Sequence, residues 1–80
     1  MITYLKSKEM SSLFSQDPST ESDGGFQSLL VRLQRKTNKP TGIINLSAED
    51  IADIIRYSKA YGSGGWENTL KQIFSRTLHI

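Results

Sequence analysis

The chain lacks cysteine, has one histidine and two prolines, and contains no long apolar run. Without cysteine it has no disulfide framework, no thiolate metal ligand and no thiol nucleophile. The single histidine, His79, excludes a site built from several histidines, and nothing near it in the sequence would hold it for a catalytic triad. We therefore expect a non-enzymatic protein without a cofactor or a metal ion.

Membrane insertion and secretion are not expected either. The longest apolar clusters are residues 42–46 and 54–55, far shorter than the roughly 20 apolar residues of a membrane span. Residues 1–6 lack the charged start and the apolar core of a secretory signal. We expect a cytoplasmic protein that makes no contact with a membrane.

The length of 80 residues predicts one small domain, residues 1–80. Its net charge of +2 is too small to indicate an acidic partner by itself. The charges nevertheless form blocks: residues 9–31 contain acids and no base, and residues 32–39 contain bases and no acid. An acidic cluster then follows, made of Glu49, Asp50 and Asp53. This order predicts a surface with separate positive and negative regions.

Apolar residues at helical spacing predict four helices in a compact, mainly α domain. Met10, Leu13 and Phe14 mark the first, and Phe26, Leu29, Leu30 and Leu33 mark the second. The third is expected at residues 48–61, followed by Gly62, and the fourth begins at Trp66.

Ser47 is the expected N-cap of the third helix, where its hydroxyl can accept from the N–H of Asp50. The acidic cluster suits the positive end of the same helix dipole. That explains the cluster better than a cation site, for which other oxygen ligands are not obvious.

Two short segments favour extended structure. Residues 3–5 are β-prone and form either a strand or an ordered arm, and residues 43–46 form a short extended segment. A minor two-stranded pairing of residues 2–5 with residues 43–46 would add a small sheet to the helices.

The sequence also repeats itself with an offset of about 40 residues. Gly24-Gly25-Phe26 corresponds to Gly64-Gly65-Trp66, and each triplet is expected to open a helix. The pattern predicts two units of similar order, residues 3–37 and 43–77, related as a two-fold pseudo-repeat. The alternative is coincidence, because any helical domain alternates apolar stripes with glycine breaks.

A basic stripe lies about 120° around the second helix from its apolar face. It consists of Arg32, Arg35, Lys36 and Lys39. The stripe is either a solvated helix face or a surface that binds phosphates or a protein. Tyr57 and Tyr61, one turn apart, are either interface anchors or a half-buried pair. We predict that these six residues bind the partner.

The C-terminal half contains a distinctive run of residues: Leu46–Ile51, Arg56-Tyr57, Tyr61–Glu67, Leu70 and Ile73–Leu78. This pattern resembles that of short phage and proteobacterial proteins of mobile elements, which are similar in kind to anti-CRISPR proteins. The resemblance implies a protein that binds and blocks a larger host protein or nucleoprotein complex. It carries over no site residues, because anti-CRISPR proteins share no common fold. The alternative function is a small DNA- or RNA-binding protein that uses the basic helix face, and the oligomeric state stays open.

Overall fold

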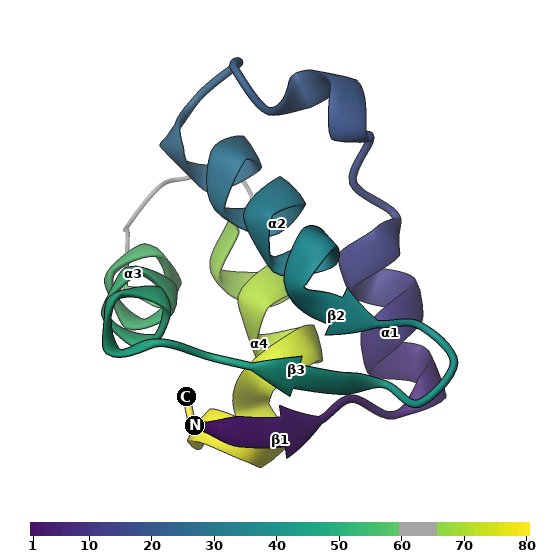
Figure 1. Cartoon of the computed structure of the whole chain (residues 1–80). Coiled ribbons are helices and arrows are strands. Elements are labelled where there is room, and N and C mark those ends of the chain that lie inside the picture. Colours follow the sequence, from purple (N-terminus) through teal and green to yellow (C-terminus); the bar gives the residue numbers. More distant parts are fainter. Residues whose placement is uncertain (60–65) are drawn as a thin grey trace.

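The computed structural model describes residues 1–59 and 66–80, apart from the side chains of Trp66 and Glu67. It confirms the predicted mainly α domain with four helices and adds a small sheet (Figure 1). The elements in chain order are β1 (Ile2–Tyr4), α1 (Ser7–Phe14), the 3₁₀ turn η1 (Pro18–Thr20), α2 (Gly25–Lys36), β2 (Thr37–Asn38), β3 (Ile43–Asn45), α3 (Ala48–Ser58) and α4 (Trp66–Leu78). No helix within these described ranges is long and apolar enough to cross a membrane.

The three strands form an antiparallel sheet in the order β1-β3-β2. Ile2 lies opposite Asn45 and Tyr4 opposite Ile43, so the predicted pairing of residues 2–5 with 43–46 is confirmed. The short strand β2 was not predicted. Because α2 ends at Lys36, Lys39 lies beyond the helix, in the turn between β2 and β3. The prediction that Lys39 lies on the same helical stripe as Arg32 is therefore wrong.

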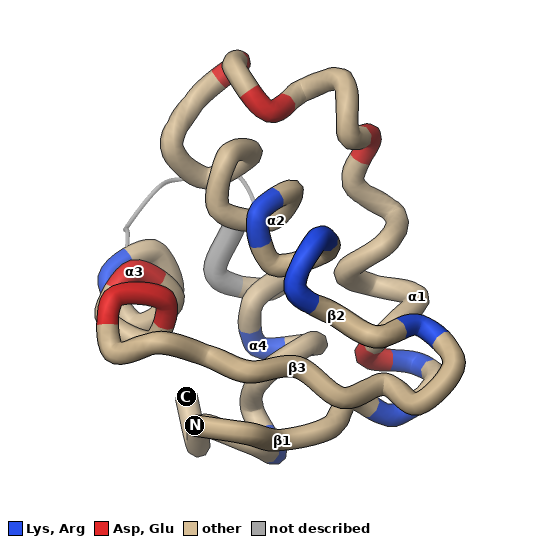
Figure 2. Tube along the Cα trace, viewed as in Figure 1, with Lys and Arg blue, Asp and Glu red and all other residues tan. Residues whose placement is uncertain are grey.

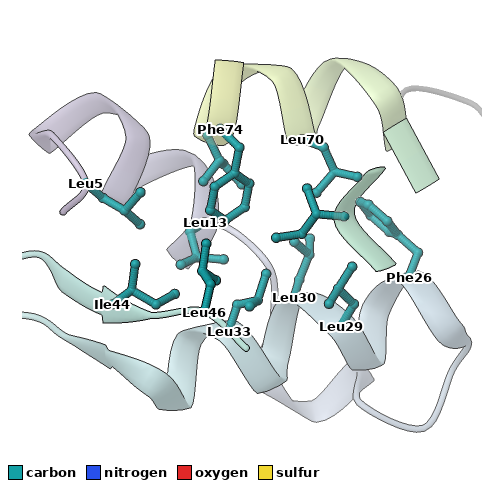
Figure 3. Packing of buried hydrophobic residues seen from close by; sticks show 12 residues of the cluster. Leu5, Leu13, Phe26, Leu29, Leu30, Leu33, Ile44, Leu46, Leu70 and Phe74 are labelled. Atoms are coloured by element: carbon teal, nitrogen blue, oxygen red, sulfur yellow. The ribbon is translucent and has the colours of Figure 1, made fainter. Parts of the chain in front are cut away.

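One face of the sheet packs on the helices and forms a single core with them (Figures 1 and 3). The strands supply Ile44 and the adjoining Leu46, both fully buried. Figure 3 shows them meeting leucines of α2 and Phe74 of α4. The remaining buried apolar side chains are Leu5, Leu13, Phe26, Leu29, Leu30, Val31, Leu33, Ile54, Leu70 and Ile73. The predicted apolar stripe of α2 is thus its core face.

The start of α3 follows its sequence signal. The N–H of Asp50 donates to Ser47 Oγ at 3.0 Å, which confirms the predicted N-cap, and the N–H of Ser47 donates to Asp50 Oδ2 at 2.9 Å. The helix ends at Ser58, earlier than the predicted 61. The N–H of Lys59 bonds to Arg56 O at 3.3 Å, closing a tighter last turn. Gly62, which is predicted to follow the end of this helix, lies outside the described residues.

The order of elements is compatible with the predicted repeat. A strand followed by two helices occurs as β1-α1-α2 and again as β3-α3-α4, whereas β2 belongs to the first series alone. The two Gly-Gly-aromatic triplets cannot be compared in the structure. Phe26 of the first is buried in the core, but the side chain of Trp66 in the second is not described. The two-fold pseudo-repeat stays a prediction.

Replacing Gly42 by alanine is expected to lower the free energy of unfolding by about 2 kcal/mol. Gly42 has a φ of +75°, and an added Cβ would lie 2.5 Å from the carbonyl oxygen of Leu5. Leu5 in turn donates its N–H to Gly42 O at 2.8 Å, so the two segments cannot separate without losing this bond. Urea denaturation followed by circular dichroism measures the change.

Gly24→Ala is the matched control. Gly24 has an extended backbone, and an added Cβ would meet only the flexible end of Gln27. Gly24 is also the N-cap of α2, where alanine is less favourable than glycine, so we expect a loss of at most about 1 kcal/mol. Equal losses in the two variants would show that neither the positive φ nor the contact with Leu5 matters.

Candidate binding surface

Two cations of the basic stripe are held by carboxylates of α3. Arg32 donates from Nε to Asp50 Oδ1 at 3.0 Å and from Nη2 to Asp53 Oδ2 at 3.1 Å. Lys36 donates from Nζ to Asp50 Oδ2. Figure 2 shows the red start of α3 beside the blue positions of α2. These contacts join two helices, so Arg32 and Lys36 have a structural role whether or not they also bind a partner.

The other two members of the stripe also have intramolecular contacts. Arg35 forms a bidentate ion pair with Glu21, which directly follows η1, with N–O distances of 2.5 and 2.9 Å. Both side chains are well exposed, so this pair contributes little to stability. The Lys39 ammonium lies 4.4 Å from the centre of the Phe14 ring. The stripe does not present four free charges, and its role in binding stays a prediction.

Asp50 is the centre of the charge network between α2 and α3. Its side chain is 2% exposed, and its two oxygens accept from Arg32, Lys36 and the Ser47 N–H. Burial alone would raise the pKa of this carboxyl, but the hydrogen bonds from Lys36 and Ser47 outweigh it and lower the pKa to about 2. Asp50 therefore does more than complement the helix dipole, because it neutralises two cations of α2.

A second charge network joins β1, α1 and α4. Arg76 of α4 donates from Nη2 to Glu9 Oε1 at 2.8 Å and from Nε to Glu9 Oε2 at 3.1 Å. Its Nη2 also donates to the carbonyl of Tyr4 at 2.7 Å, and the N–H of Lys6 donates to Glu9 Oε1 at 2.7 Å. Burial alone would raise the pKa of Glu9, but the bonds from Arg76 and Lys6 lower it overall.

These two carboxyls predict a loss of stability in acid. Each has a lower pKa in the folded chain than its usual value, which is 3.8 for Asp50 and 4.5 for Glu9. Their contribution is therefore complete above the usual values and is lost as the pH falls through the folded ones. Because its pKa falls from 3.8 to about 2, the Asp50 carboxylate alone contributes about 2 kcal/mol to the free energy of unfolding at neutral pH. We expect the urea midpoint to be constant from pH 7 to 5 and to fall between pH 4.5 and 2. A midpoint that stays constant down to pH 2.5 would contradict both networks.

The predicted tyrosine anchors are only partly described. Tyr57 is half-buried, and its ring meets that of Phe26 edge to face with centroids 6.1 Å apart. The Arg56 guanidinium lies 4.9 Å from the centre of the Tyr57 ring. Tyr61 lies outside the described residues. Tyr57 is thus tied to the core at the α2–α3 contact, and its part in binding stays a prediction.

Three of the four exposed large apolar side chains of the described chain, Ile2, Tyr4 and Ile43, gather on the outward face of the sheet, and we call this surface the sheet face. The fourth, Met1, pairs with the buried Leu46 and so lies on the other side of the strand from Ile2. Ile2 is 74% exposed and Tyr4 is 51% exposed. Tyr4 lies directly opposite Ile43 across the β1–β3 ladder, so their side chains share one side of the sheet. Contiguous apolar residues on a surface mark a site of interaction more often than scattered ones do.

The sheet face was not among the predicted binding residues. Its signal in the sequence is the alternation of Ile2, Tyr4 and Lys6, which puts these three on one side of an extended segment. This signal has meaning only if the segment is a strand with one buried face. Residues 3–5 alone fit a strand and an arm equally well.

No three His, Cys, Asp or Glu side chains come close enough to hold a metal ion in the part of the chain that the structure describes. No protein family matches the sequence, and neither a curated protein nor a solved structure matches the chain. The geometry of the surface is therefore the basis for a functional proposal.

Proposed function

We propose that the protein acts by binding a larger protein or nucleoprotein assembly and blocking it, without catalysing a reaction. The observation that carries the proposal is the sheet face, where three of the four exposed large apolar side chains of the described chain lie together. Keeping such a patch in water has a cost of about 25 cal/mol for each Å² of apolar surface. A partner that covers the patch removes this cost.

The size of the patch fits the centre of an interface. Three side chains, the largest a tyrosine, cover only part of the roughly 800 Å² that each partner contributes to a standard interface. Such interfaces have an apolar core surrounded by a polar rim. The sheet supplies this arrangement, because Asn38 and Asn45 are exposed around the apolar residues.

Inhibition rather than simple attachment is proposed from the resemblance to small phage proteins of the anti-CRISPR kind. A protein of 80 residues that covers a functional surface of a large assembly can stop it by occupying space. Chemistry would need reactive groups, and the sequence offers no cysteine and one histidine.

A second candidate function is direct binding of DNA or RNA. It is favoured by Tyr4, which is exposed and follows the same side of the chain as Lys6, because an exposed aromatic ring near a cation can stack on a base. This candidate predicts binding of bare nucleic acid that weakens steeply between low and moderate salt. If no nucleic acid binds at low salt, the candidate is removed.

The proposed function is tested by capture followed by titration. The wild type, the double variant Ile2→Thr/Tyr4→Thr and the control Arg35→Gln are used in parallel to capture complexes from a bacterial lysate. We expect one assembly that the wild type and the control retain and the double variant loses. Adding the protein to that purified assembly should then stop its activity at about one equivalent per site. An assembly that keeps its full activity when saturated would contradict the proposal.

A further inference from the structure

The sheet face continues into a positively charged end. Lys6 has an extended backbone, with a φ of −75° and a ψ of 166°, so it follows Ile2 and Tyr4 on the same side of the chain. The N–H of Leu5, next to Lys6, donates to Gly42 in the turn that also contains Lys39. Figure 2 shows blue segments at this end, where β1 enters α1 and where β2 turns into β3.

The lysines at this end form no ion pair with the part of the chain that the structure describes. They are Lys6, Lys8 and Lys39, and all of them are exposed. The nearby acid is Glu9, and both of its oxygens are bound by Arg76. The other three members of the basic stripe differ from Lys39 in this respect, since Arg32, Arg35 and Lys36 all have carboxylate partners.

The apolar part of the surface fits a protein better than a nucleic acid. Ile2 and Ile43 are aliphatic and offer no ring on which a base could stack. The one aromatic ring, Tyr4, already has the Arg76 guanidinium 4.9 Å from its centre. Aliphatic side chains pack well against the apolar side chains of a protein segment.

We infer that the sheet face and its lysine end bind an acidic protein segment, in which apolar side chains are accompanied by aspartate or glutamate. The apolar residues of the segment cover Ile2, Tyr4 and Ile43, and its carboxylates lie near Lys6 and Lys39. This inference rests on the proposed binding function and names the chemistry of the partner. The charges set the orientation of the segment and speed its association.

Selection from a library of displayed random peptides of about 12 residues tests the inference without knowledge of the natural partner. The wild type is the bait, and peptides that also bind Ile2→Thr/Tyr4→Thr are discarded. We expect the retained peptides to combine leucine, isoleucine or phenylalanine with aspartate or glutamate. The best peptide should bind at least about tenfold more tightly than its analogue with lysine at each acidic position, and high salt should reduce this ratio. Lys6→Gln should weaken binding a few-fold, and the control Lys59→Gln, an exposed lysine at the end of α3, should not.

Retained peptides that are neutral or basic, or no retained peptides at all, would overturn the inference. Displacement of the best acidic peptide from the wild type by an oligothymidine of about 20 nucleotides would also overturn the inference. None of these results bears on whether an assembly is blocked, so the proposed function can stand when the inference fails. Conversely, an acidic peptide bound at the sheet face together with an assembly that keeps its activity would support the inference and reject inhibition.

Discussion

The double variant Ile2→Thr/Tyr4→Thr is expected to lower the affinity for the captured assembly at least about 100-fold. A few central residues carry most of the binding energy of an interface, and tyrosine is prominent among them. Two such residues at somewhat more than 1 kcal/mol each give this factor. Threonine is β-branched, a shape that strands favour, so the ladder between β1 and β3 should persist in the double variant. Biolayer interferometry against the immobilised assembly measures the affinity.

The control for this variant is Arg35→Gln. Arg35 is the most exposed arginine of the basic stripe, and its ion pair with Glu21 contributes little to stability. We expect its affinity to stay within about threefold of the wild type, since rim charges act mainly on the association rate. Both variants should unfold at the wild-type urea concentration. A large loss of affinity in Arg35→Gln and none in the double variant would move the interface to α2.

Arg32 is less suitable for testing the basic stripe. A glutamate at this position would face Asp50 and Asp53, both of which now bind Arg32. Its charge reversal would therefore weaken the contact between α2 and α3 as well as any contact with a partner. Arg35 separates the two effects.

Asp50→Asn is expected to lower the free energy of unfolding at pH 7 by about 3 kcal/mol. Removing one partner of a buried ion pair typically has an effect of 3–5 kcal/mol, and the value expected here is at the low end because Arg32 and Lys36 are about a third exposed. A folded chain of 80 residues has a total free energy of unfolding of only about 4–12 kcal/mol. The loss should therefore be visible as a large fall in the urea midpoint.

Glu49→Gln is the matched control for Asp50→Asn. Glu49 lies in the same first turn of α3 and is exposed, and no ion pair joins it to the residues that the structure describes. We expect a change of about 0.5 kcal/mol, from the helix dipole alone. If the two variants lost equal stability, Asp50 would act only through the helix dipole. Its bonds to Arg32 and Lys36 would then contribute nothing to the stability of the fold.

The helices could be predicted from the sequence because their signals are local. The apolar spacing of Phe26, Leu29, Leu30 and Leu33 marks a core face wherever the helix packs, and Ser47 caps α3 through a bond to a residue three positions away. The strand β2 has no such signal. Thr37 and Asn38 are extended because they pair with Ile44 and Ile43, and that pairing depends on the turn between them.

The surface was harder to predict because it depends on how distant segments meet. The blocks of opposite charge at residues 32–39 and 49–53 are visible in the sequence, where they predict two separate regions of the surface. The packing of α2 against α3 instead brings Arg32 and Lys36 onto Asp50. The sheet face depends in the same way on β3, which buries Ile44 and leaves Ile43 outside.

Hydrogen–deuterium exchange of the free protein and of its complex with the captured assembly tests the central claim most directly, because it needs no substitution. In an antiparallel ladder alternate amides point away from the partner strand. The bonds of Leu5 to Gly42 and of Leu46 to Met1 put the amides of Ile2 and Tyr4 on the outer side of β1. The account predicts slower exchange on binding in residues 1–6 and 41–46 and little change in α2. Protection confined to residues 29–39, with unchanged exchange in β1 and β3, would contradict it.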